Sequence, residues 1–199
     1  MASSRCPRAR AVATTPRNGL PSVTEILGAV QLTGDFSGIA VDVLDAARDR
    51  GSAVHAAVHD DVYHCLDEAS LPPEVLARVT GWRRFLKDSG YRPILAEGTV
   101  VSTRWQFCGH LDGVGWIGPE RTLLDLKCVA TLDPDIVSYQ LGGYDLAWME
   151  QRPKEPFKRY LGLQLLPDDY RVHDVTARMP HARQVFQAAL IVFAARGGK

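Results

Sequence analysis

Two aspartates and one lysine near the middle of the chain have the residue types and spacing that metal-assisted hydrolysis requires. Asp125 and Lys127 lie two residues apart in Thr122–Val129, so their side chains share one face if this segment is a β-strand. Asp112 lies in Phe107–Trp116, and pairing of the two segments around a Gly-Pro turn would bring the carboxylates together. Neighbouring carboxylates repel each other unless a hard divalent cation binds them. A lysine beside them can stabilise an anion or orient a water molecule.

The neighbours of Asp125 are apolar, which makes its charge costly. Leucines precede and follow it at Leu123, Leu124 and Leu126, and such a nearly continuous apolar strand predicts burial on both faces. A buried charge is unfavourable unless it is paired or binds a metal ion. For this strand taken alone, a buried Asp–Lys ion pair without any catalytic role is the alternative interpretation.

A helix that follows these strands carries a second polar pair. We expect it over Pro134–Glu150, with Asp133 as its start signal. Gln140 and Tyr144 are four residues apart and therefore lie on one face of this helix. The glycine pair 142–143 weakens helix propensity, and close packing on the sheet would explain it.

An earlier helix carries histidines. The apolar periodicity predicts it from Val41 to about Ala69, with Gly51 interrupting it. His55 and His59 are four residues apart, but a zinc site formed by them lacks the glutamate of the metalloprotease motif. For His59, as for the later His64, we expect an ordinary solvated or packed helix position.

Taken in chain order, these residues resemble the PD-(D/E)XK nuclease superfamily, and most closely its RecB-like and phage exonuclease branch. The resemblance rests on Gly-His-Leu-Asp112, Leu-Leu-Asp125-Leu-Lys127 and Tyr-Gln140-x-x-x-Tyr144. The segment Gly-Ser-Ala-Val-His55 is similar to the G-x-x-x-H element of RecB-like nucleases. The segment Ala-Glu97-Gly-Thr-Val resembles their additional acidic element, although a surface glutamate in a strand is an equal alternative.

The resemblance implies a fold and a site. The expected fold is one α/β domain with a central mixed β-sheet flanked by helices, as in restriction endonucleases. One or two Mg²⁺ or Mn²⁺ ions would be held by Asp112, Asp125, the backbone carbonyl of Leu126 and His55. Glu97 would contribute directly or through water, and Lys127 would position the attacking water. Gln140 and Tyr144 would orient the substrate or support the site.

The implied activity is that of a metal-dependent DNA exonuclease in phage-type recombination, replication or DNA repair. The absence of a zinc finger or helix-turn-helix pattern favours this over a site-specific endonuclease. Two alternatives stay open: a structure-specific endonuclease that cuts flaps or nicks, and a DNA-binding module that has lost catalysis. The expected partner is DNA, with a recombination or single-strand-annealing protein and self-association as further possibilities.

The formal net charge is zero, so no global electrostatic attraction to nucleic acid is expected. Any DNA contact must come from a local basic surface. The helix expected over Pro72–Asp88 presents Arg83, Arg84 and Lys87 on one face, and these are candidates for contact with DNA phosphates. An ordinary solvated face is the alternative interpretation. No apolar run approaches the roughly 20 residues that a membrane-spanning helix needs.

The cysteines indicate neither zinc nor a dense disulfide framework, because the four of them are scattered and contain no CxxC pair. We therefore expect a reducing, cytoplasmic setting. Some RecB-like relatives hold an iron–sulfur cluster with one early cysteine and three late ones. No cysteine follows Cys128, so we expect no such cluster.

The first residues differ in composition from the rest. Residues 1–19 contain four arginines, no acidic residue and no apolar stretch of a secretory signal. We expect a disordered basic arm here and the nuclease domain over 20–199. A mitochondrial transit peptide has the same composition, which makes the mitochondrial matrix the alternative location.

The remaining elements follow from local signals. Ser22 and Glu25 form a capping box that predicts a helix start. We expect strands over Arg92–Thr103, Arg159–Leu166 and Tyr170–Val175, the last two joined by a Pro-Asp-Asp turn. A closing helix is expected over Pro180–Ala195, with Val185, Ala188 or Ala189, and Val192 facing inward.

Overall fold

A five-stranded mixed sheet forms the centre of the computed structural model, which describes residues 19–34, 38 and 40–198. The basic arm expected over residues 1–19 therefore lies almost wholly outside the described residues. The strands occur in chain order across the sheet. They are β1 (Arg92–Ser102), β2 (Phe107–Ile117), β3 (Glu120–Lys127), β4 (Arg159–Leu166) and β5 (Asp169–Asp174). Neighbours are antiparallel except β3 and β4, which are parallel because the helix α4 (Pro134–Gln151) crosses between them.

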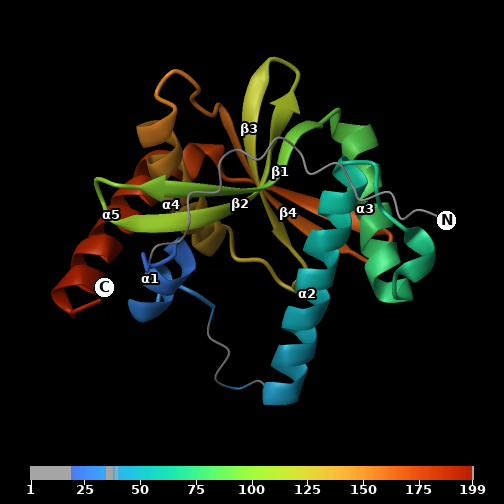
Figure 1. The fold of residues 1–199 in the computed structure, drawn as a ribbon, viewed down its shortest axis with the longest axis horizontal. Coiled ribbons are helices and arrows are strands. Elements are labelled where there is room, and N and C mark those ends of the chain that lie inside the picture. Colours follow the sequence, from blue (N-terminus) through green and yellow to red (C-terminus); the bar gives the residue numbers. More distant parts are fainter. Residues whose placement is uncertain (1–18, 35–37, 39, 199) are drawn as a thin grey trace.

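Helices cover both faces of this sheet (Figure 1). The first three are α1 (Val23–Ala29), α2 (Val41–Val62) and α3 (Pro73–Ser89), and α5 (Met179–Ala195) closes the chain. The helices α2 and α3 pack on one face, whereas α4 lies on the other with α1 and α5 against it. The single α/β domain with a mixed sheet flanked by helices, as expected from the sequence, is thus confirmed.

Each face of the sheet has its own hydrophobic core. The larger core joins β1 and β2 to α1, α4 and α5. The ring centroids of Phe107 and Phe186 lie 5.1 Å apart in it. The other joins α2 and α3 to β3 and β4 around Trp82 and Phe85. Leu123 and Leu124 are both fully buried and belong to different cores. The strand that carries Asp125 is therefore buried on both faces, as its apolar sequence predicted.

Local signals at two helix starts are confirmed. Ser22 Oγ accepts a hydrogen bond from the backbone of Glu25, and the Glu25 side chain accepts one from the backbone of Ser22. Asp133 caps α4 through a hydrogen bond from the backbone of Asp135 at 2.8 Å. Short polar side chains at these positions satisfy N–H groups that have no partner within the helix.

The expected extent of the second helix is wrong. Gly51 does not interrupt α2, which runs unbroken from Val41 and ends at Val62 rather than near Ala69. The backbone of His64 is left-handed, with φ of 56°, so the chain turns away there. The hydroxyl of Tyr63 then reaches the backbone of Ala96 in β1. A contact between two residues 33 apart in the chain thus fixes the end of α2, which local propensity did not reveal.

Two packing expectations also need correction. In α5 the inward side chains are Ala182, Phe186, Ala189 and Leu190, whereas Val192 is 41% exposed. A Cβ at Gly142 would lie 3.0 Å from the backbone of Ala182, so these glycines allow close contact with α5 and α1 and not with the sheet. Bulkier side chains would push α4 away from α5. Within the described residues, no helix is long and apolar enough to cross a membrane.

Candidate active site

The strands β2 and β3 separate where the two aspartates lie. Their last backbone pair in this direction is Gly113 with Leu124, and Asp112 and Asp125 are the next residues in register. Beyond that point Leu126 donates its backbone N–H to Asp112 Oδ2 at 2.7 Å. The side chain of Asp112, and not the backbone of β2, is therefore the hydrogen-bond partner of the Leu126 N–H. This separation leaves room for the carboxylates between the strands.

Asp112 is held in its ionised form. His55 on α2 places Nδ1 3.3 Å from Asp112 Oδ1. Burial opposes the charge, but the hydrogen bond and charge of His55, with Lys127 and the Leu126 N–H, lower the pKa of Asp112. Burial likewise opposes protonation of His55, yet contact with Asp112 raises the pKa of His55. The structure thus brings His55 to the aspartates, as expected, in direct contact with one of them.

Asp125 has less support than Asp112. It is fully buried, and its Oδ2 lies 2.7 Å from Lys127 Nζ. Its other oxygen, Oδ1, has no hydrogen-bond partner. Burial raises the pKa of Asp125 to about 6, against the opposing effect of the Lys127 charge, and the charge of Asp112 adds to the rise. A buried carboxylate with an unsatisfied oxygen is unfavourable and would gain from a bound cation.

A chain of hydrogen bonds links Lys127 to α4. Lys127 Nζ donates to Gln140 Oε1 at 3.1 Å, and Gln140 Nε2 donates to Tyr144 Oη at 2.6 Å. Gln140 and Tyr144 share one face of α4, as their spacing predicted, and that face is turned toward the lysine. Gly109 in β2 leaves space for the Tyr144 ring, because a Cβ there would lie 2.6 Å from the ring. A glycine of the sheet thus permits the position of the tyrosine.

We expect Gly109→Ala to disturb this chain. The added methyl group would displace the buried Tyr144 ring and so weaken its bond to Gln140, at a cost of about 1–3 kcal/mol in unfolding free energy. Gly28→Ala is the matched control, because its Cβ would meet nothing within 4 Å and alanine favours a helix. Thermal unfolding of both variants measures the difference, and equal stabilities would refute the proposed close contact.

Among the described residues, Glu97 forms no hydrogen bond or ion pair with the residues of this network. It is exposed in β1 and, between the pairs Ala96–Gly113 and Gly98–Leu111, stands beside Asp112 in register. Its backbone is left-handed, with φ of 53°. The Tyr63 hydroxyl contacts both N and O of the neighbouring Ala96. A non-glycine residue held in this conformation is strained, and such strain is common at functional sites.

We expect this strain to show in two substitutions. Glu97→Gly and Glu97→Ala remove the same carboxylate, but only glycine adopts a positive φ without penalty. The glycine variant should be more stable than the alanine variant by about 1 kcal/mol. Both should lose the same amount of activity if the carboxylate contributes to it. Urea unfolding of the two proteins measures the stability difference, and a more stable alanine variant would contradict the strain.

The donors at this site fit a hard divalent cation with few protein ligands. Among the described residues, no three His, Cys, Asp or Glu side chains converge closely enough to hold a metal ion. Magnesium, however, is usually bound by one or two carboxylates, with waters and substrate phosphates completing its shell. Asp112 and Asp125 supply those carboxylates, and the unpartnered Asp125 Oδ1 is one available ligand. The roles expected for Asp112, Asp125, His55, Glu97 and the Leu126 carbonyl as ligands stay predictions.

A cavity of about 870 Å³ opens onto these residues. His55, Asp112, Lys127 and Gln140 line part of it. The rest of its wall comes from the N-terminal half of α2, the segment after β3 and the start of α4, and most of that wall is apolar. No sequence pattern predicted this cavity, because its walls come from segments distant along the chain.

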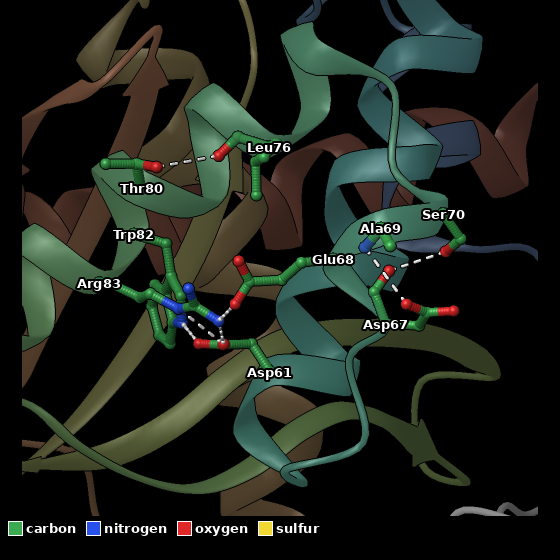
Figure 2. Close-up of polar contacts among 9 residues, drawn as sticks. All are labelled: Asp61, Asp67, Glu68, Ala69, Ser70, Leu76, Thr80, Trp82 and Arg83. Carbon is green, nitrogen blue, oxygen red and sulfur yellow. Dashed lines mark hydrogen bonds and ion pairs between the residues drawn. The ribbon is translucent and has the colours of Figure 1, made fainter.

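The basic face of α3 does not contribute to the cavity lining. Arg83 lies between Asp61 and Glu68 (Figure 2). Its Nη2 atom is 2.6 Å from Asp61 Oδ1 and 2.8 Å from Glu68 Oε1. Asp61 also accepts a hydrogen bond from Trp82 Nε1 at 3.1 Å. Arg84 pairs with Asp88 and Asp169 at 3.7 and 3.3 Å. These two arginines are therefore largely neutralised by carboxylates. The contact with DNA proposed for Arg83, Arg84 and Lys87 stays a prediction. The ion pairs of the two arginines leave them less charge to offer a phosphate.

The chain has low similarity to known proteins. No family model matches it, and no curated protein matches it in sequence. The solved structures with low similarity to it include SSO0001 and an alkaline exonuclease. SSO0001 is 10% identical, with a TM-score of 0.35, over 72% of this chain and 74% of that one. An alkaline exonuclease from Laribacter hongkongensis is 14% identical, with a TM-score of 0.37, over 90% and 91%. Likeness at these TM-scores carries no argument about function.

Proposed function

We propose that this protein is a metal-dependent deoxyribonuclease that hydrolyses phosphodiester bonds, acting from DNA ends as an exonuclease. The observation that carries the proposal is the pair of aspartates at the separation of β2 and β3, with Asp125 buried and Asp112 half-buried, Lys127 beside Asp125 and an unpartnered Oδ1. The motif order read from the sequence supports the same activity. The cavity gives a substrate access to this point.

The surroundings of Asp112 and Lys127 set their charges and therefore their roles in the proposed reaction. Asp112 stays ionised at neutral pH because its pKa is lowered, and with Asp125 it would hold Mg²⁺ or Mn²⁺. The cation would supply Lewis-acid chemistry, making water a better nucleophile and offsetting charge on the phosphate. Lys127 stays protonated, because its carboxylate neighbours outweigh burial and raise its pKa. It can therefore orient water or stabilise the developing anion.

The supporting residues hold this arrangement in place. Gln140 fixes the Lys127 ammonium, and Tyr144 fixes Gln140. His55 orients the Asp112 carboxylate from the other side. Catalytic groups must be held to within a fraction of an ångström, so residues of this kind affect rate without touching the scissile bond.

The test is cleavage of end-labelled linear DNA, single- and double-stranded, with Mg²⁺ or Mn²⁺ and with chelator as control. Progressive shortening from the ends, absent with chelator, is the expected result and would also give the polarity. Nicking of closed circular DNA would favour the endonuclease alternative. A folded, metal-saturated protein that binds DNA but cuts none of these substrates would refute the nuclease and leave a binding module.

A further inference from the structure

The cavity beside the aspartates has a polar end, formed by the candidate active site, and a longer apolar wall. That wall includes Val43, Leu44 and Ala47 of α2, together with Val129 after β3 and Ile136 of α4. Val43 and Val129 are 58% and 39% exposed, so the wall is open to solvent. An open apolar surface is unfavourable in water and marks a place where a ligand binds.

On α2, the apolar wall lies on a part of the helix that does not pack on the sheet. The buried residues of α2 are Val54, Ala57 and Val58, all in its second half. Residues 41–53 are exposed or half-buried, and Figure 1 shows this half of the helix projecting away from the strands. The apolar side chains that line the cavity from α2 therefore add little to the folded core. They remain available to a ligand.

Arg50 lines the same cavity and, along α2, lies between the apolar wall and His55. Its Nε atom is shielded from solvent and, within the part of the chain that the structure describes, has no hydrogen-bond partner. A shielded N–H group without an acceptor is unfavourable. The guanidinium also presents its donors in a planar fork that matches a phosphate. The cavity thus offers a phosphate contact next to an apolar surface.

An apolar wall with a cationic donor beside it fits a nucleotide whose base is unpaired. The flat faces of the bases can contact apolar side chains, but in a duplex the neighbouring bases cover them by stacking. In a single strand the base can lie on the protein while its phosphate contacts a basic side chain. Aliphatic side chains have no donors or acceptors with which to distinguish the bases, so this binding should not depend on sequence.

We propose that the cavity binds the unpaired nucleotides of a DNA strand that adjoin the phosphate to be cut. Their bases lie against Val43 and the rest of the apolar wall, and Arg50 binds a backbone phosphate. This rests on the proposed function, which supplies DNA as the polymer and the aspartates as the point of cleavage. It adds the substrate class, which is single-stranded DNA. A duplex must first open at its end, because its stacked bases cannot reach the wall.

The test is DNA binding in chelator, where no cleavage occurs. A fluorescent single-stranded oligonucleotide should bind more tightly than a blunt duplex of equal length with G·C ends. Val43→Ser should weaken binding of the single strand by about threefold to tenfold, through lost apolar contact. The same variant should bind a strand of abasic sites as the wild type does, because that strand has no bases. Val172→Ser is the matched control, since this β5 valine is 42% exposed and lies outside the cavity lining.

Arg50→Gln should have a different effect from Val43→Ser. The slope of log affinity against log salt should become shallower by about 0.7, because one phosphate contact is lost. This change should be the same for the normal and the abasic strand, since both have the same backbone. Arg50→Lys keeps the charge and should keep the slope, with weaker binding because the planar fork is lost.

The outcomes separate this proposal from the nuclease itself. Equal or tighter binding of the blunt duplex would overturn the single-strand site even if the wild type cuts DNA. So would wild-type affinity of a folded Val43→Ser protein for the normal strand, an equal loss in Val172→Ser, or an unchanged salt slope in Arg50→Gln. The expected pattern of binding, with no cleavage by the wild type, would support the single-strand site and refute the nuclease.

Discussion

Replacing Lys127 with Ala is expected to lower the rate of metal-dependent DNA cleavage by about 100-fold or more, with the fold retained. The ammonium group lies 2.7 Å from Asp125 and is the cation that Gln140 holds beside the cavity. Among the described residues, no other lysine lines the cavity. The loss should appear in kcat more than in KM if the ammonium acts chiefly on the transition state.

The controls for this variant follow from its surroundings. Lys127→Ala also leaves Asp125 without its ion-pair partner, so circular dichroism and thermal unfolding must show that the protein is folded. Lys154→Ala removes an exposed lysine from the turn after α4, outside the cavity, and should cut DNA at the wild-type rate. Wild-type cleavage by a folded Lys127→Ala protein would remove the lysine from the mechanism. The aspartates would then have to act without it.

Much of the fold could be predicted because its signals are local. Alternation and apolar runs gave the strands to within a few residues, and capping residues gave the starts of α1 and α4. The aspartates could be placed together because strand pairing and the turn between β2 and β3 fix the register. The contact of Gln140 with Tyr144 likewise follows from helical spacing.

The features that escaped prediction depend on contacts far apart along the chain. The end of α2 and the left-handed backbone of Glu97 are linked by the Tyr63 hydroxyl, and neither is encoded by a local pattern. Arg83 looked free in the sequence because Asp61, its partner, is 22 residues away. Local patterns placed the carboxylates, but only the tertiary structure shows that Arg83 and Arg84 are ion-paired.

The stability of the metal-free protein should fall as pH rises from about 4 to 6, relative to that of Asp125→Asn. The folded-state pKa of Asp125 is raised to about 6 from an ordinary value of 3.8, chiefly by burial. Between these two values the folded protein holds a proton that the unfolded chain has released. Since stability rises with pH only where the unfolded state binds more protons, the contribution of this group decreases through the window. The change should be roughly 2–3 kcal/mol.

Added Mg²⁺ or Mn²⁺ should reverse this trend in the wild type. A cation binds the ionised carboxylate, so it stabilises the folded state more as pH rises, through mass action. Asp125→Asn keeps the shape of the side chain but has no charge to offer, and its melting temperature should respond much less. Chemical unfolding at several pH values, with metal or chelator, measures both effects. If wild type and variant respond equally to metal, Asp125 is not a ligand, and its raised pKa reflects burial and the charge of Asp112 without a role in metal binding.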